Sequence, residues 1–347
     1  WRGHWRPIGA PMTDRQQLSR DFLAAAGWGA ARRQPLAGDA SDRRYERLTL
    51  GSRSAVLMDA PPGKGDDPAD FLRIGRHLRG LGLSAPDCLA EDLPSGFLLL
   101  EDLGDGVFAH VVLGDPALEM PLYTLATDAL AHLQAHPAPP GLPDLTAKDW
   151  AEAAAFALDW YRFAINGDRV ATGDFVLALT EALTDHADGP RVLILRDYHA
   201  ENLMWLPERA GLSRVGLLDF QLGQMGQPVY DLVSLLQDAR REVGVPTARA
   251  CMAAFAARTG ADDAATRRAA TVFGAQRALR ILGIFARLCL VGGKPGYLQM
   301  MPRVWGQLQQ NLAAPELSGL RRICDDLLPP PGPENLLRIG EKCGRFR

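Results

Sequence analysis

The strongest constraint on the fold is a change in hydrophobic pattern near residue 103. Before it, residues 45–50 and 55–59 read as strands around the turn Gly51-Ser52, and "GFLLLEDLGDG" reads as a buried strand that runs into a glycine-rich turn. After it, segments rich in alanine and leucine dominate, and strands become few and short. The segments expected to be mostly helical are 117–136, 146–165, 173–188, 228–243, 247–259, 264–291 and 297–313. The pattern predicts an α+β protein with a small mixed part followed by a larger helical part.

Three shorter stretches complete this outline. Residues 13–29 are expected to form a capped helix, with Leu18 and Phe22 in its apolar stripe. A second helix is expected in "PADFLRIGRHLRGLGL", where apolar residues recur with a helical period. The C-terminal stretch "LPPPGPENLLRIGEKCGRFR" begins with a proline spacer and is expected to be an appendage.

Composition excludes several classes of protein. The chain has 347 residues, of which 47% are hydrophobic, so it can bury a sizeable core. Its net charge is −3 and no basic stripe stands out, which argues against nucleic acid as a partner. No apolar run approaches the roughly 18 residues that span a bilayer, so no membrane association is expected. The cysteines are scattered and form no C-x-x-C pair, which fits a reducing, cytoplasmic location better than a disulfide or zinc framework. They are Cys88, Cys251, Cys289, Cys324 and Cys343.

Three polar residues bracket two short apolar runs in "LILRDYHAENLMWLPERAGLSRVGLLDFQ". The runs 203–206 and 215–218 flank a loop with proline and glycine, which predicts an antiparallel hairpin. Asn202 comes directly before the first run and Asp219 directly after the second, so both are expected at the open end of the hairpin. Asp197 lies on the loop that leads into it.

This trio has the chemistry of a phosphoryl-transfer site. A carboxylate and an amide oxygen, without soft ligands, suit a hard cation such as Mg²⁺. A further carboxylate nearby suits a base that orients a hydroxyl group.

The stretch resembles the catalytic loop of small-molecule kinases of the aminoglycoside phosphotransferase family, whose pattern is H-G-D-x-H-x-x-N followed by a hairpin and D-[FW]. Here it reads Leu195-Arg196-Asp197-Tyr198-His199-Ala200-Glu201-Asn202, then Asp219-Phe220-Gln221. The resemblance implies that Asp197 is the catalytic base and that Asn202 and Asp219 are metal ligands. His199 matches the second family histidine, which either orders the loop or is a structural histidine. Leu195 replaces the first.

The resemblance covers most of the chain and implies a two-lobed protein-kinase-like fold. The expected boundaries are a nucleotide-binding N-lobe over 1–100, a hinge over 101–106, a helical C-lobe with the acceptor site over 107–328, and a tail over 329–347. Backbone groups of Glu101 and Leu103 would meet an adenine in the hinge. Asp231, near the start of the helix after the metal turn, would support the catalytic loop.

The small lobe departs from the kinase pattern. Kinases usually place a lysine on the third strand to hold the nucleotide phosphates, and here Met58 stands at about that position. Lys64, the only lysine in this lobe, lies in a loop. The loop "GDASDRRYERL" offers a substitute, because Ser41 can meet phosphate oxygens and Arg43 and Arg44 supply positive charge.

Longer phrases point to one branch of the family. The stretches "GDASDRRYERL", "LLLEDLGD", "LRDYHAENLMWLP" and "YDLVSLLQDARR" resemble bacterial kinases that phosphorylate N-acetylmuramate and N-acetylglucosamine at the anomeric C1 hydroxyl in cell-wall (peptidoglycan) recycling. The resemblance implies ATP and Mg²⁺ as cofactors, a small amino sugar as substrate and no obligate protein partner.

Arginines and aromatic residues are candidates for sugar contacts. An arginine fork suits the lactyl carboxylate of muramate, and Arg196 is the first choice, with Arg303 second. In "FALDWYRF", Asp159 and Trp160 could meet a sugar, or the segment is simply a helix with aromatic core residues. Glu201 either contacts sugar or faces solvent, and His199 is placed with these candidates.

Two alternatives to a sugar-1-kinase stay open. One is a kinase of another small hydroxyl acceptor, such as an aminoglycoside, a choline-like alcohol or another sugar. The helices after residue 228 are rich in arginine, which disfavours a polycationic aminoglycoside. The arginines are Arg240, Arg241, Arg249, Arg267, Arg268, Arg277, Arg280, Arg287 and Arg303. The other alternative is an inactive ATP-binding scaffold, which the missing strand lysine favours and the intact trio opposes.

Overall fold

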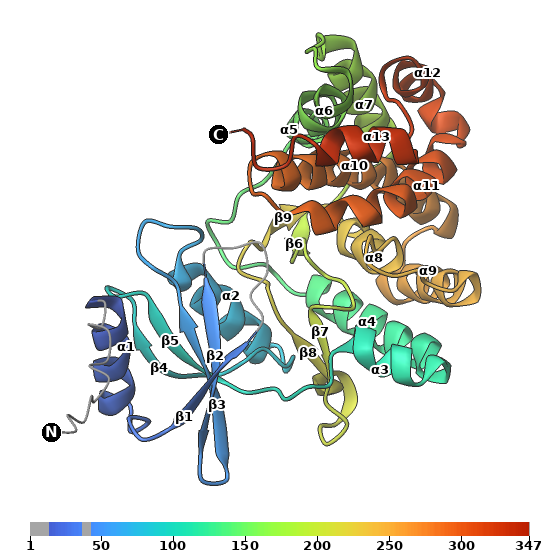
Figure 1. The fold of residues 1–347 in the computed structure, drawn as a ribbon. Helices are drawn as coiled ribbons and strands as arrows, with labels where there is room; N and C mark the ends of the chain where they lie inside the picture. The colour runs from blue at the N-terminus through green and yellow to red at the C-terminus, as the bar shows by residue number, and fades with distance from the viewer. Residues whose placement is uncertain (1–13, 37–42, 347) are drawn as a thin grey trace, which may run out of the picture. The chain divides into compact units, whose positions relative to one another are not determined.

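The computed structural model describes residues 14–36 and 43–346 and divides the chain into two compact units (Figure 1). Unit 1 runs to Gly80 and resumes over Ala85–Gly104. Unit 2 comprises the short segment Leu81–Ser84 and everything from Asp105 onward. The division near residue 104 coincides with the change in hydrophobic pattern.

Unit 1 is built on a five-stranded antiparallel sheet with the order β1-β2-β3-β5-β4. The strands are β1 (Arg32–Leu36), β2 (Arg44–Leu50), β3 (Arg53–Asp59), β4 (Cys88–Asp92) and β5 (Phe97–Glu101). The strands expected from the sequence correspond to β2, β3 and β5, and the turn between β2 and β3 uses Gly51 with φ of 62°. Strands β1 and β4 were not predicted, because neither is an apolar run; β1 is almost wholly exposed.

One face of this sheet carries a hydrophobic core under the first helix. Helix α1 (Asp14–Ala25) places Phe22 and Leu23 in a cluster with Leu48, Leu57 and Phe97. Strand pleating sends alternate residues to opposite faces. Tyr45 and Arg47 of β2 therefore lie on the other face, together with Met58, which pairs with Tyr45. Helix α2 (Pro68–Gly80) is the second predicted helix.

Unit 2 is mostly helical, and the predicted helices are largely confirmed. Its helices are α3 (Phe108–Gly114), α4 (Glu119–Gln134), α5 (Ala147–Ala154), α6 (Phe163–Asn166), α7 (Gly173–His186), α8 (Val229–Leu236), α9 (Val245–Thr259), α10 (Asp263–Leu290), α11 (Met301–Leu312), α12 (Ser318–Leu327) and α13 (Pro333–Gly340). The α+β class is therefore confirmed. None of the helices in the described parts of the chain is long and apolar enough to cross a membrane.

Two of the expected helices are interrupted. The segment 146–165 contains α5, a π-helical segment over Ala157–Arg162, and α6. The segment 228–243 stops being helical after Leu236. The side chain of Asp238 accepts a hydrogen bond from the backbone N–H of Arg240 at 2.8 Å, and such local side-chain bonds compete with continuation of a helix.

The long helix α10 organises unit 2. It packs against α5, the π-helical segment, α7, α8, α9, α11 and α13. In the view of Figure 1, α5, α6 and α7 lie on one side of α10, and the small β-strands of the unit lie on the other. These strands form two antiparallel pairs: β6 (Val192–Ile194) with β9 (Gln224–Gly226), and β7 (Leu203–Trp205) with β8 (Val215–Leu217).

The C-terminal stretch is part of unit 2, which differs from the expected appendage. Helix α13 packs against α6 and α10, and Ile339 is fully buried. Beyond it, Lys342 Nζ donates to the carbonyl of Ala164 at 2.6 Å, and the Phe346 ring packs edge-on against Phe163. The proline spacer thus leads the chain back onto the helices.

Candidate active site

The predicted hairpin is confirmed, and it brings Asn202 next to Asp219 along the backbone. Strands β7 and β8 pair with Leu203 opposite Leu217. One further backbone hydrogen bond, from Leu218 N–H to the Asn202 carbonyl at 3.0 Å, continues the ladder at the open end. Asp219 is the next residue, so the two proposed ligands leave the same end of the hairpin.

Asp197 joins them through the loop between β6 and β7. The Asn202 side chain donates from Nδ2 to the Asp197 carbonyl oxygen at 3.0 Å, and the Asn202 backbone N–H donates to the His199 carbonyl at 2.8 Å. The loop therefore folds back on itself, and residues 197 and 202 lie in direct contact. The structure thus gathers the three residues of the trio at one place in unit 2.

Left-handed backbone conformations occur on both sides of the site. Arg196 has φ of 73° and Asp219 has φ of 55°, and they are the non-glycine residues with positive φ in the described parts of the chain. Such conformations cost free energy in L-residues and cluster at functional sites. Asp219 is exposed, and its Oδ1 accepts a hydrogen bond from Gln221 Nε2 at 2.7 Å.

Asp231 holds the start of the catalytic loop. It lies in the first turn of α8, is fully buried, and accepts hydrogen bonds from Leu195 N–H at 2.5 Å and Arg196 N–H at 2.8 Å. Burial raises the pKa of Asp231 to about 6, although the two backbone hydrogen bonds oppose the shift. The contacts match the supporting role that the family resemblance implies for this residue.

His199 is a neutral acceptor in this arrangement. Burial, with the charges of Arg240 and Arg277, lowers the pKa of His199 to about 3. Its Nε2 lies 3.4 Å from Asn202 Nδ2 and 3.3 Å from Arg240 Nη1, both of which are donors. The Nε2 atom therefore carries a lone pair, which fixes the proton on Nδ1. Because Asn202 uses Nδ2 for the Asp197 and His199 contacts, its Oδ1 remains to act as an acceptor or ligand.

Arg277, on α10, is a residue that sequence reasoning missed. Its Nη1 donates to the Arg196 carbonyl at 3.3 Å, and its Nη2 donates to Ser234 Oγ at 2.6 Å. Ser234 Oγ in turn donates to the same Arg196 carbonyl at 3.3 Å. The backbone of Arg196, the residue before Asp197, is therefore held through both its N–H and its C=O group. The sequence carried no signal for this, because Arg277 is one of many arginines in these helices.

The other sugar-contact candidates differ in their distance from the loop. Arg303 donates to the Ala239 carbonyl at 3.1 Å and so reaches the turn that carries Arg240. Glu201 is half-buried. The pKa of Asp238 is raised mainly by the burial of Asp238 itself, and the negative charge of Glu201 raises it further. Arg303 and Glu201 both lie close to the His199 side of the site.

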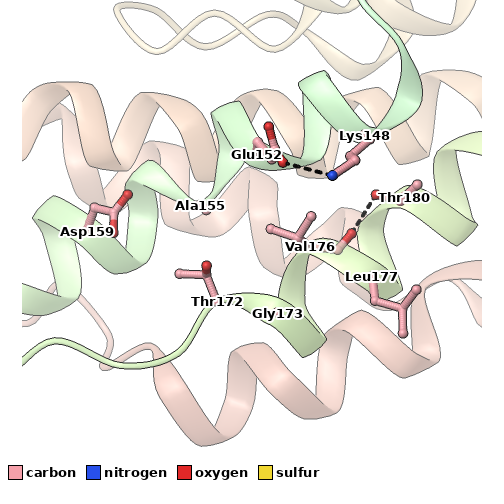
Figure 2. Close-up of a pocket in the computed structure, with 9 residues that line it drawn as sticks. All are labelled: Lys148, Glu152, Ala155, Asp159, Thr172, Gly173, Val176, Leu177 and Thr180. Carbon is pink, nitrogen blue, oxygen red and sulfur yellow. Dashed lines mark hydrogen bonds and ion pairs between the residues drawn. The ribbon is translucent and has the colours of Figure 1, made fainter.

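Asp159 and Trp160 belong to the π-helical segment, which packs against α10. The Arg287 guanidinium lies 5.7 Å from the centroid of the Trp160 ring. Arg287 is ten residues beyond Arg277, which corresponds to a rise of about 15 Å along a helix. Asp159 lines a groove of about 590 Å³ between α5, the π-helical segment and α7, which Figure 2 shows together with the Lys148–Glu152 ion pair. No contact of these two residues connects them to the catalytic loop in the described structure.

In unit 1, Arg43 rather than Arg44 lies in a buried position. The Arg43 side chain is only 3% exposed and pairs with Asp66 Oδ2 at 2.5 Å, whereas Arg44 is exposed. Met58 is fully buried, which leaves β3 without a positive charge at this position. Ser41 lies outside the described residues.

The end of β5 offers complementary backbone groups. Glu101 uses its N–H to donate to the Asp87 carbonyl at 2.8 Å, so its carbonyl oxygen is the group that it can offer to an adenine. Within the described chain, no hydrogen bond occupies the N–H of Leu103. An acceptor and a donor two residues apart can pair with one edge of a purine.

The donor set at the hairpin suits Mg²⁺. In the described ranges, no cluster of three or more His, Cys, Asp or Glu side chains is arranged to hold a metal ion, so a closed zinc-type site is absent there. One carboxylate and one amide oxygen instead match a Mg²⁺ ion that completes its shell with nucleotide phosphates and water.

Comparison with known proteins identifies the family. Residues 32–270 match the model of the phosphotransferase enzyme family. The chain belongs to this family. The matched range runs from β1 to α10 and includes the whole catalytic loop.

Curated relatives of this phosphotransferase share most of its length. An N-acetylmuramate/N-acetylglucosamine kinase of Caulobacter vibrioides is 37% identical over 91% of this chain and 98% of its own. A protein of the same name from Pseudomonas aeruginosa is 33% identical over 88% of this chain and 93% of its own. The relationship therefore extends through both units.

Solved structures confirm the kinase-like fold of the phosphotransferase. The GDP complex of wild-type aminoglycoside 2′-phosphotransferase-IIIa aligns with a TM-score of 0.58 and 15% identity over 87% of this chain and 99% of that one. A streptomycin–ATP ternary complex of an APH(2″)-IIa enzyme aligns with a TM-score of 0.55 and 12% identity over 79% of this chain and 91% of that one.

Proposed function

We propose that the phosphotransferase transfers the γ-phosphoryl group of ATP, with Mg²⁺, to the anomeric hydroxyl of N-acetylmuramate and N-acetylglucosamine. The observation that carries this proposal is the 37% identity, over nearly the full length of both chains, to a kinase named for these two sugars. The product would be a sugar 1-phosphate for peptidoglycan recycling in the cytoplasm.

The catalytic loop supports the chemical roles. Asp197 would accept the proton of the attacking hydroxyl, and an anomeric hydroxyl is acidic enough for this transfer to occur late. Asn202 and Asp219 would hold Mg²⁺, which neutralises the charge that develops on the phosphate oxygens. The Asn202 contacts that engage Nδ2 leave Oδ1 for this purpose.

Unit 1 supports nucleotide binding without a strand lysine. Arg43 is the better candidate for the phosphate-binding charge, because it lies directly before β2 with a buried side chain, whereas Arg44 faces solvent. Arg43 would have to exchange Asp66 for a phosphate oxygen, or share its guanidinium between the two. The carbonyl of Glu101 and the N–H of Leu103 would pair with adenine.

A substrate panel tests the proposal. The protein is incubated with ATP, Mg²⁺ and each of N-acetylmuramate, N-acetylglucosamine, glucose and kanamycin, and the phosphorylated carbon is identified by ³¹P–¹³C NMR. We expect transfer to C1 of the two N-acetyl sugars. Transfer to kanamycin alone would establish the antibiotic kinase instead, and no transfer together with no ATP affinity would indicate a scaffold.

Asp197→Asn provides the matched chemical control in this panel. We expect turnover to fall at least 10³-fold, because the amide cannot accept the proton, while the dissociation constant for ATP changes little. Near-normal turnover of this variant would contradict the assignment of the base.

A further inference from the structure

The guanidinium of Arg196 is an unpaired cation beside the catalytic base. The side chain is half-buried, and its Nε is buried without a hydrogen-bond partner. Within residues 14–36 and 43–346, its guanidinium makes no hydrogen bond or ion pair. A partly buried charge without a partner is unfavourable unless an anion joins it.

The backbone conformation of Arg196 adds a second reason. Its φ of 73° is one that glycine adopts freely and that other L-residues adopt at a cost. The family pattern H-G-D has glycine at this position, so the arginine brings strain that a glycine would not. Asp231, Ser234 and Arg277 hold this backbone through its N–H and C=O groups, and none of these contacts uses the Arg196 side chain. The guanidinium is therefore not needed to shape the loop.

A second unpaired arginine lies in the same neighbourhood. Arg280 is half-buried and lies one turn beyond Arg277 on α10, and in the described chain its side chain makes no hydrogen bond or ion pair. The Arg277 guanidinium lies 4.7 Å from the centroid of the Tyr230 ring. Burial raises the pKa of Tyr230, but the charges of Arg277, Arg280 and Arg196 together lower it. Arg277 already uses both terminal nitrogens, which leaves Arg196 and Arg280 to meet a ligand.

We propose that Arg196 and Arg280 form an anion subsite that binds the carboxylate of an acidic acceptor sugar, the lactyl group of N-acetylmuramate. This inference rests on the proposed function. The phosphate end of the site lies with Asn202 and Asp219 at the hairpin, whereas Arg196 precedes the base that receives the acceptor hydroxyl. An anion at Arg196 therefore belongs to the acceptor, and guanidinium groups bind carboxylates through paired, charge-assisted hydrogen bonds.

The subsite predicts a selective loss of activity. The values of kcat/KM for N-acetylmuramate and for N-acetylglucosamine, at saturating ATP, are compared in wild type, Arg196→Gly and Arg280→Gln. Loss of a hydrogen bond between charged groups corresponds to about a 10- to 150-fold decrease, which we expect for N-acetylmuramate in both variants. N-acetylglucosamine lacks the carboxylate, so its kcat/KM should stay within about twofold. Arg268→Gln, at an exposed position of α10, is the matched control and should leave both values unchanged.

Each outcome distinguishes the possibilities. A similar loss for both sugars would overturn the subsite, because it would mean that the arginines act on ATP or on the base. Unchanged values for both would also overturn it. Addition of guanidinium ion should partly restore N-acetylmuramate phosphorylation by Arg196→Gly, and absence of any rescue would count against a contact between this guanidinium and the sugar carboxylate. If wild type phosphorylates neither sugar, the proposed function itself fails, and the subsite with it.

Discussion

At the scale of single residues, Asp231 connects α8 to the catalytic loop. Its buried carboxylate accepts two consecutive backbone N–H groups, those of Leu195 and Arg196. A buried carboxylate is costly to ionise, and the hydrogen bonds offset only part of that cost. The backbone of the loop is therefore held by a carboxyl group whose pKa is about 6.

The raised pKa of Asp231 predicts a pH-dependent stability. The pKa is about 6 in the folded chain against an ordinary value of 3.8, so the folded state binds this proton more tightly. Its stabilising contribution is complete below about pH 3.8 and is lost as the pH rises through 6. Asp231→Asn removes this titration. Between pH 5 and pH 7.5, the wild type should lose about 1 kcal/mol more free energy of unfolding than the variant.

Urea unfolding followed by tryptophan fluorescence at the two pH values measures this difference. Other titrating groups are common to both proteins and cancel. Parallel pH dependences of the wild type and Asp231→Asn would show that the carboxyl group keeps its ordinary pKa.

The grouping of Asp197, Asn202 and Asp219 was predictable from the sequence because its geometry is local. A two-strand hairpin places the residue before one strand beside the residue after the other, whatever the rest of the chain does. The roles of Ser234 and Arg277 depend on contacts across 38 and 81 residues of sequence, which no local pattern encodes. The left-handed φ of Arg196 was equally invisible, because arginine is not a residue that signals it.

At the scale of elements, α10 and the π-helical segment meet at a glycine. A Cβ atom on Gly283 would come within 2.3 Å of the carbonyl carbon and oxygen of Phe156. The backbone of Phe156 therefore lies so close to α10 that a side chain at position 283 would clash with it. The apolar pattern of 146–165 predicted a helix. It gave no indication of the contact with Gly283 or of the π-helical segment that follows Phe156.

Gly283→Ala should destabilise the protein although alanine favours helices. The clash is with backbone atoms, so the two elements must separate, at a cost of about 1–3 kcal/mol in the free energy of unfolding. Gly306→Ala in α11 is the control, because a Cβ there meets nothing within 4 Å. That control should gain about 0.5–1 kcal/mol from helix propensity. Thermal and urea unfolding of both variants measure the effects, and equal stabilisation by both would refute the close packing.

At the scale of the whole molecule, the proline-rich composition of the C-terminal stretch led to a wrong prediction of its packing. The proline spacer suggested an appendage, but the residues after it include both buried and exposed positions on unit 2. Ile339 is fully buried, whereas Leu337 is 64% exposed. The sequence alone could not separate these two, because the surface that receives Ile339 is built from helices far earlier in the chain.

This pair of residues provides a test of the packed tail. Ile339→Ala should lower the free energy of unfolding by about 2–4 kcal/mol, because it removes buried methyl groups and leaves a cavity. Leu337→Ala should change it by no more than about 0.5 kcal/mol. The two variants are compared by urea denaturation, and equal, small effects would show that α13 does not pack in solution.

The short segment Leu81–Ser84 belongs to unit 2 although unit 1 surrounds it in the sequence. Ser84 accepts the backbone N–H of Leu217 at 2.7 Å, and its hydroxyl donates to the Ser213 carbonyl at 2.6 Å. Neither unit is therefore one continuous stretch of the gene. A recombination event at residue 104 that exchanged the first part of this enzyme for that of a distant homologue would also replace the four residues that brace the hairpin. Chimaeras should inherit the catalytic machinery intact only when Leu81–Ser84 travel with it.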